Sequence, residues 1–193
     1  MLDNLSRFHI FLASKSPRRR ELLKMLRIKF DSVVISGIKE VYPPELPLEE
    51  VPEYLSRLKA DAYLDKIKEN QLLITADTVV ICDDMILGKP RDKEDALRML
   101  MLLSGKTHEV VTGVTVTTLE KQKSFRSTTL VTFSEICESD AKYYIERFSP
   151  LDKAGAYGIQ EWIGCVAVEK IDGSFYNVMG LPVHSLYKEL KEF

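Results

Sequence analysis

The sequence predicts a mixed α/β fold in which helices flank a sheet with a cleft. Apolar, strand-like runs alternate with amphipathic, helix-like segments along the 193 residues. Residues 109–119 and 124–133 are rich in valine and threonine and flank a polar turn, which predicts a long antiparallel hairpin. Such a hairpin argues against a purely parallel, doubly wound sheet. Because no repeat or low-complexity linker divides the chain, we expect residues 1–193 to form one domain.

The expected strands are β-branched or apolar runs that end at glycine, proline or polar turns. They cover residues 9–13, 30–35, 72–76, 78–82, 109–119, 124–133 and 165–171. Asp83 and Asp84 are expected to form the tip of a second, shorter hairpin.

The expected helices follow apolar residues at helical spacing. They begin at Ser16, Pro47, Asp92, Ser139 and Val183. The helix that begins at Pro47 should bury one apolar face, made of Leu48, Val51, Leu55, Leu58 and Ala62. The helix that begins at Asp92 should end at Leu103, before a serine and a glycine.

Composition and charge exclude several classes of protein. Lysine and arginine number 27 against 29 acidic residues, a net charge of −2 that argues against a general nucleic-acid binder. No apolar stretch reaches the roughly 20 residues that span a bilayer, and no secretory leader is apparent, so we expect no membrane association. Cys82, Cys137 and Cys165 are isolated, which favours small buried residues in a protein of the reducing cytoplasm.

The start of the first helix carries an unusual charge pattern. Ser16 is a good N-cap and Pro17 suits the first helical position. Arg18, Arg19 and Arg20 then fall in the first turn, where each cation is unfavourable by roughly 0.3–1 kcal/mol. A bound polyanion reverses this sign, because backbone N–H groups, serine hydroxyls and guanidinium groups converge on it. The pattern favours a phosphate site over its alternative, a solvated basic turn.

Two carboxylates are candidates for chemistry. Asp77 follows an apolar strand where the β-pattern is interrupted, and it is either a metal ligand or water-activating base, or an Asx turn that ends the strand. Glu40 lies in the loop after the second strand and by itself would be a surface residue. Together they could supply oxygen ligands to magnesium or manganese, which also bind substrate phosphates.

Three further side chains suit recognition of a nucleotide. Lys59, on the long helix, and Lys89, between a glycine and a proline, offer point charges for phosphate oxygens. Gln160 ends a glycine-rich loop and can both donate and accept hydrogen bonds, as reading the edge of a base requires. Taken singly, each of the three is more often a solvated surface residue.

The order of these motifs resembles the Maf family of nucleotide pyrophosphatases. The matching segments are residues 12–23, 75–78, 88–92, 104–108, 151–160 and 180–182. The resemblance extends from about residue 9 to about residue 190. It implies a fold like that of inosine triphosphatases, with a long central sheet and a cleft between two lobes. It also implies hydrolysis of a nucleoside triphosphate to the monophosphate and pyrophosphate, a divalent cation (Mg²⁺ or Mn²⁺) and a homodimer.

The resemblance also implies roles for individual residues. Asp77 matches the catalytic base and Glu40 a carboxylate near the metal. The phosphate-handling positions are Ser14, Arg18, Arg19, Lys59 and Lys89, to which the charge pattern above adds the Ser16 hydroxyl. The positions associated with substrate choice are Arg18, Thr78 and Gln160. The Gly-Ile-Gln form resembles the branch that acts on dTTP and UTP, rather than the branch that prefers 7-methyl-GTP.

Two segments depart from the pattern of that branch, and two alternatives stay open. Glu161 and Trp162 follow Gln160 where a glycine is common, and Ser56 replaces an alanine. One alternative is the same hydrolysis on modified or non-pyrimidine nucleotides. The other is a nucleotide-binding regulator of septum formation without turnover. The water-activating carboxylate Asp77, together with Glu40 and the two lysines, favours catalysis.

Overall fold

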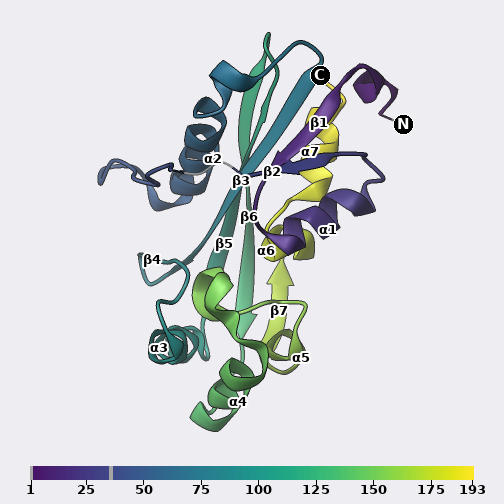
Figure 1. Ribbon diagram of the computed structural model, residues 1–193. Coiled ribbons are helices and arrows are strands. Elements are labelled where there is room, and N and C mark those ends of the chain that lie inside the picture. The colour runs from purple at the N-terminus through teal and green to yellow at the C-terminus, as the bar shows by residue number, and fades with distance from the viewer. Residues whose placement is uncertain (1, 35–36) are drawn as a thin grey trace. The chain divides into compact units, whose positions relative to one another are not determined.

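The computed structural model describes residues 2–34 and 37–193 and contains a seven-stranded mixed sheet (Figure 1). The strands are β1 (His9–Ala13), β2 (Asp31–Val33), β3 (Gln71–Cys82), β4 (Met85–Leu87), β5 (Thr107–Thr117), β6 (Gln122–Phe133) and β7 (Val168–Asp172). Their order is β2-β1-β3-β5-β6-β7, and β4 pairs with β3 outside this path. β1 is parallel to both β2 and β3, whereas β3–β4 and β6–β7 are antiparallel. The predicted mixed α/β class is confirmed.

The helices occupy most of the segments that the apolar spacing predicts. They are α1 (Pro17–Met25), α2 (Val51–Asp61), α3 (Lys93–Leu103), α4 (Glu138–Phe148), α5 (Trp162–Ala167), α6 (Phe175–Met179) and α7 (Val183–Leu190). Asp92 caps α3 by accepting a hydrogen bond from the Asp95 amide at 2.8 Å. Of the seven, α5 and α6 were not predicted.

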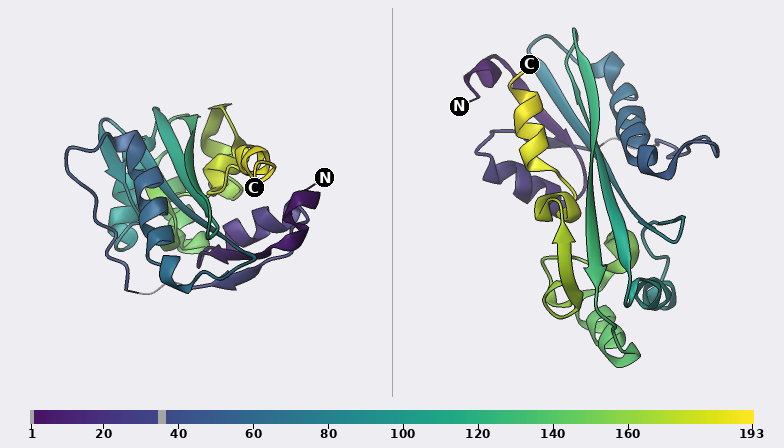
Figure 2. Two further views of the ribbon diagram at one scale, coloured as in Figure 1. Left: turned by 90° about the horizontal axis from the view of Figure 1, so that it is seen from above. Right: turned by 180° about the vertical axis from the view of Figure 1, so that it is seen from behind.

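The chain divides into two compact units. The first unit comprises Met1–Asp77, Thr112–Ser127 and Gly180–Phe193, and the second comprises Thr78–Val111 and Thr128–Met179. In the first unit α2 lies on one face of the strands, and α1 and α7 lie on the other (Figure 2). Opposite faces are expected here, because the β1–β2 and β2–β3 crossovers run in opposite directions along the sheet and each is right-handed. Asn4 and Arg7 tie the N-terminal turn to the carbonyls of Leu190 and Phe193 at the end of α7.

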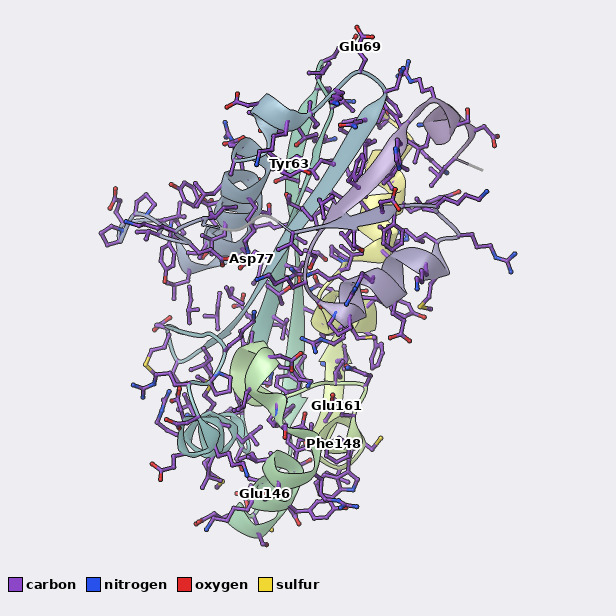
Figure 3. All side chains as sticks on the ribbon, in the orientation of Figure 1. Tyr63, Glu69, Asp77, Glu146, Phe148 and Glu161 are labelled. Atoms are coloured by element: carbon purple, nitrogen blue, oxygen red, sulfur yellow. The ribbon has the colours of Figure 1, made fainter. Side chains whose placement is uncertain are left out.

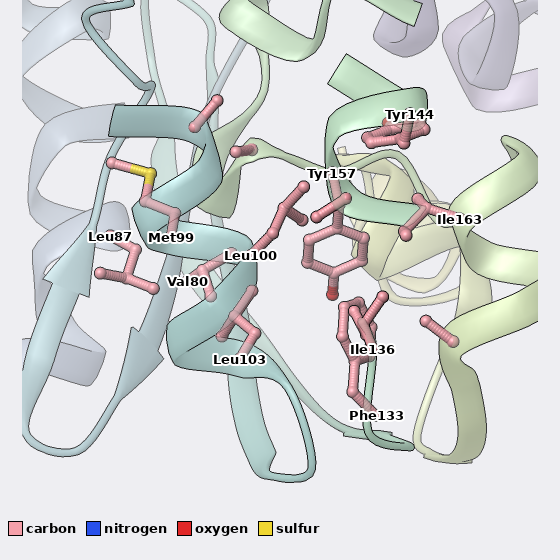
Figure 4. Close-up of a cluster of buried hydrophobic side chains, with 14 of the residues drawn as sticks. Val80, Leu87, Met99, Leu100, Leu103, Phe133, Ile136, Tyr144, Tyr157 and Ile163 are labelled. Atoms are coloured by element: carbon pink, nitrogen blue, oxygen red, sulfur yellow. The ribbon is translucent and has the colours of Figure 1, made fainter. Parts of the chain in front are cut away.

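The second unit has its own apolar core between α3, α4 and the loop before α5 (Figure 4). Leu100, Phe133 and Ile163 are completely or almost completely buried there. The tip of its β3–β4 hairpin is Asp83-Asp84, as predicted, and both residues have left-handed φ values of 50° and 56°. Consecutive left-handed residues match the twist of a two-residue hairpin.

Several predicted boundaries are wrong for identifiable reasons. Residues 72–76 and 78–82 belong to one continuous strand, β3, so Asp77 lies within a strand rather than at its end. Cys165 begins no strand, because Ile163 and Ala167 are both buried at the i, i+4 spacing of a helix. β2 covers only Asp31–Val33 of the predicted 30–35, and Ile35 lies outside the described residues.

The predicted buried face of the long helix is also wrong in part. A short 3₁₀ turn, Leu48–Glu50, precedes α2, and the α-helix begins only at Val51. Ser56 and Ala60 are fully buried, whereas Leu58 is half-buried and Ala62 is exposed. Small residues therefore face the sheet, and a hydrophobicity pattern gives them too little weight.

Buried His108 is expected to make the stability of the protein depend on pH. Its Nε2 lies 2.8 Å from the Tyr157 hydroxyl, and burial lowers the pKa of His108 from 6.5 to about 4. The unfolded chain therefore binds a proton more readily than the folded one. The contribution of neutral His108 to the free energy of unfolding is present above pH 6.5 and is lost as the pH drops from 6.5 toward 4. We expect the free energy of unfolding to fall by about 2 kcal/mol between pH 7.5 and pH 5 on this account.

Urea unfolding of the wild type and of His108→Gln at both pH values measures this difference. The variant should lose that part of the pH dependence, because it has no imidazole to protonate. Parallel pH profiles for the two proteins would contradict the assignment.

Candidate active site

The first turn of α1 is built by two serines. The Ser16 hydroxyl accepts a hydrogen bond from the Arg19 amide at 3.4 Å, and the Ser14 hydroxyl accepts one from the Ser16 amide at 3.2 Å. The predicted N-cap and the predicted start at Pro17 are thereby confirmed. Because both hydroxyls act as acceptors in these bonds, neither bond uses the hydroxyl proton, which an anion could accept. Arg18 lies partly buried in the same turn.

Arg19 fastens this turn to two other segments of the first unit. Its Nε donates to the Gly180 carbonyl at 2.8 Å, and a terminal guanidinium nitrogen donates to the Ala76 carbonyl at 2.7 Å. Burial lowers the pKa of Arg19, and the neighbouring charges of Asp77 and Glu40 act in the opposite direction. The guanidinium therefore lies within electrostatic reach of both carboxylates. Its anchoring role was not predicted, although residues 180–182 belong to a motif that the sequence analysis singled out.

Lys59 brings the two candidate carboxylates together. Its Nζ lies 2.5 Å from Asp77 Oδ1 and 3.2 Å from Glu40 Oε2. The side chains of Lys59 and Asp77 are only 15% and 14% exposed, whereas that of Glu40 is 51% exposed. Figure 3 shows Asp77 on β3. A carboxylate in the middle of a strand is therefore stabilised by a buried cation, which makes the Asx-turn alternative wrong.

A buried group of hydroxyls holds α2, and with it Lys59, against the sheet. The Ser56 hydroxyl lies 2.8 Å from the Thr115 hydroxyl of β5, and the Thr75 hydroxyl of β3 donates to the Ser56 carbonyl at 2.7 Å. Two residues before Thr115 on β5 is Gly113, where a Cβ atom would lie 2.2 Å from the backbone nitrogen of Glu53. The serine at position 56 thus contributes a side-chain hydrogen bond between α2 and the sheet.

The donor set suits a cation that is shared with a substrate. Among the described residues, no group of three or more histidine, cysteine, aspartate or glutamate side chains is arranged to hold a metal ion. Asp77 and Glu40 nevertheless converge on one point, the Lys59 ammonium. Magnesium commonly binds through one or two carboxylates and completes its octahedron with water and phosphate oxygens. Two carboxylates fit that pattern and do not form a complete protein cage.

The second unit contains the remaining predicted residues. Thr78 is half-buried directly after Asp77, whereas Lys89 and Gln160 are exposed on separate loops. These two loops are joined, because the Gly155 amide donates to the Gly88 carbonyl at 3.0 Å. Gly155 has a left-handed φ of 67°, and a Cβ there would lie 2.9 Å from a Val80 methyl group. A glycine is therefore required at this junction, which the sequence analysis did not detect.

The fold belongs to a known class of α/β proteins. The structure of a HAM1 protein from Coxiella burnetii matches with a TM-score of 0.50 and 11% sequence identity, over 96% of this chain and 100% of that chain. The chain therefore has a fold like that of HAM1 proteins, in agreement with the fold that the resemblance to the Maf family implied.

Sequence comparison identifies the family. The family described as Maf-like protein matches residues 9–193. A dTTP/UTP pyrophosphatase of Porphyromonas gingivalis is 55% identical over 195 residues, covering 100% of this chain and 98% of that protein. A dTTP/UTP pyrophosphatase of Phocaeicola vulgatus is 52% identical and covers 100% of both chains. The chain belongs to the Maf family.

Proposed function

We propose that this chain hydrolyses nucleoside triphosphates, dTTP and UTP above all, to the nucleoside monophosphate and pyrophosphate. The observation that carries the proposal is the Lys59 ammonium held between Asp77 and Glu40, with Arg19 anchored beside Asp77. A half-buried carboxylate beside cations does not favour the binding of an anionic nucleotide, whereas it can activate a water molecule. Its presence therefore supports catalysis over binding alone. The family and the names of its full-length relatives support the same reaction.

The first unit supplies positioning and charge in this proposal. The triphosphate lies at the start of α1, where Ser14, Ser16 and Arg18 offer donors beside the anchored guanidinium of Arg19. A polyanion there compensates the unfavourable placement of cations at a helix N-terminus. Fixed cations of this kind stabilise the charge that develops on a phosphoryl group and its leaving group.

Asp77 is the group that acts on water. Its carboxylate orients a water molecule and accepts a proton as the water oxygen bonds to the α-phosphorus. The bond between that phosphorus and the bridging oxygen breaks, and pyrophosphate leaves with the electron pair. Lys59 pairs with the Asp77 carboxylate, and its ammonium is close enough to bind phosphate oxygens as well when the substrate is present. For Lys89, the role in handling phosphate rests on the resemblance to Maf proteins.

Glu40 and Asp77 are the residues that would hold a divalent cation, Mg²⁺ or Mn²⁺. When bound, it would neutralise phosphate charge and lower the pKa of the attacking water.

We assign the choice of substrate to Arg18, Thr78 and Gln160, on the resemblance to Maf proteins. The resemblance to Maf proteins supports a homodimer, and three free cysteines support a cytoplasmic location. Of these cysteines only Cys82 is buried as expected, whereas Cys137 and Cys165 are exposed. None of the helices within residues 2–34 and 37–193 has the length and hydropathy of a membrane span.

A panel of nucleotides with product analysis tests the function. Purified protein should release pyrophosphate from dTTP and UTP in the presence of Mg²⁺ or Mn²⁺, at a kcat/KM at least about tenfold above that for the other common triphosphates. EDTA should abolish the release. Faster hydrolysis of 7-methyl-GTP or deaminated nucleotides would support the alternative substrates. Tight binding without single-turnover release would overturn catalysis in favour of a regulatory protein.

A further inference from the structure

Gln160 lies at the exposed end of a loop whose preceding residues are buried. Every residue from Gly155 to Ile159 is buried, whereas Gln160 is exposed. The turn closes at its far side, where the Glu161 amide donates to the Gly158 carbonyl at 2.9 Å. The direction of the Gln160 amide group therefore depends on how firmly the backbone at residues 158–161 is held.

The carboxylate of Glu161 is turned back onto this loop. It accepts a hydrogen bond from the Tyr144 hydroxyl of α4 and forms an ion pair with Lys153 Nζ at 3.2 Å. Tyr144 is completely buried, and the side chains of Lys153 and Glu161 are only 8% and 21% exposed. The same Tyr144 hydroxyl accepts a hydrogen bond from the Gly158 amide at 3.0 Å. One network thus connects the start of the loop, its turn and the neighbouring helix.

Gly158 provides the space that this carboxylate occupies. A Cβ atom at residue 158 would lie 2.8 Å from Glu161 Cδ and 2.9 Å from Glu161 Oε2. The carboxylate therefore packs directly on the backbone of the turn. The buried Lys153 ammonium pairs with Asp152 Oδ1 at 2.9 Å as well as with Glu161 Oε1 at 3.2 Å, so Glu161 is held by both a cation and the Tyr144 hydroxyl.

We propose that Glu161 is a positioning residue that sets the direction of the Gln160 amide, and thereby the choice of nucleotide base. The inference rests on the proposed function, which assigns Gln160 to the choice of substrate. The carboxylate of Glu161 contacts Tyr144 of α4 and the loop residues Lys153 and Gly158. A recognition group that is held in its binding direction loses less conformational freedom on binding, which raises affinity for the matching base alone.

A double-mutant cycle with Gln160 tests the proposal. Glu161→Gln keeps the size and an acceptor oxygen but removes one of the two carboxylate charges that pair with Lys153, leaving that of Asp152. We expect it to lower kcat/KM for dTTP and UTP about tenfold, mainly through KM, while kcat/KM for GTP stays within about twofold. In a Gln160→Ala background the same change should have no further effect. Additive losses in the double variant would overturn the proposal, as would an equal loss with every nucleotide.

Two other variants keep the test decisive. Tyr144→Phe removes the hydroxyl from the network while keeping the ring, and it should show the same loss of discrimination between nucleotides. This variant takes the place of Glu161→Gln in the test if Glu161→Gln does not fold. Glu146→Gln is the matched control, because Glu146 pairs with Lys93 at 2.8 Å on the surface of the same unit (Figure 3). The control should behave as wild type. If the wild type hydrolyses no nucleotide, the proposed function is overturned as well. If the wild type prefers dTTP and UTP but the effects of the Glu161 and Gln160 substitutions are additive, only the role of Glu161 is overturned.

Discussion

Replacing Asp77 by asparagine should lower kcat for pyrophosphate release by about 10³-fold, the range typical of losing a general base. Asparagine keeps the size of the side chain but cannot accept the proton of the attacking water. It also removes the anion that lies 2.5 Å from Lys59 Nζ, which leaves Glu40 at 3.2 Å as the other carboxylate partner of this ammonium. The measurement is single-turnover pyrophosphate release from dTTP at saturating substrate.

The control for this variant is another aspartate of the first unit. Asp61 is 44% exposed at the end of α2, where it pairs loosely with Arg57 at 3.9 Å. Asp61→Asn changes the net charge by the same amount and should leave kcat within about twofold of wild type. Wild-type turnover in Asp77→Asn would remove this carboxylate from the chemistry. An equal loss in both variants would assign the effect to net charge rather than to position.

Local sequence signals were sufficient to predict the start of α1. Ser16 and Pro17 carry strong preferences for their positions, and the structure confirms Ser16 as the N-cap, whose hydroxyl accepts from the Arg19 amide. The β3–β4 hairpin was equally predictable from two consecutive aspartates at its tip. Such elements depend on residues that are close in sequence, so a pattern of a few positions contains the whole interaction.

The parts that could not be predicted depend on contacts between distant residues. From the local sequence, Asp77 is expected to interrupt the strand, because the contact that stabilises it comes from Lys59, 18 positions earlier. Arg19 reaches the carbonyl of Gly180, 161 positions away, and no periodicity relates the two. Ser56 and Ala60 belong to the buried face of α2 only because a glycine on β5 lets the helix backbone come close. Residue types alone therefore identified candidate site residues, whereas packing between distant segments determines which of these residues are in contact.

Gly113→Ala should strongly destabilise the first unit. The added Cβ would lie 2.2 Å from Glu53 N, 2.3 Å from Glu53 Cα and 2.3 Å from the Pro52 carbonyl carbon. All three are backbone atoms, so no side chain can rotate away and the helix itself must shift. We expect the free energy of unfolding to fall by at least about 3 kcal/mol, the upper end for overpacking.

The same shift should impair catalysis in the molecules that still fold, because α2 also carries Lys59. A displaced helix lengthens the 2.5 Å contact between Lys59 Nζ and Asp77, so kcat/KM for dTTP should fall even at temperatures where the variant is fully folded. Urea unfolding and kinetics at low temperature separate the two effects. Gly88→Ala is the stability control, since its Cβ would meet nothing within 4 Å, and its unfolding free energy should change by less than about 0.5 kcal/mol. Equal stability in both variants would mean that α2 does not depend on the close approach at Gly113.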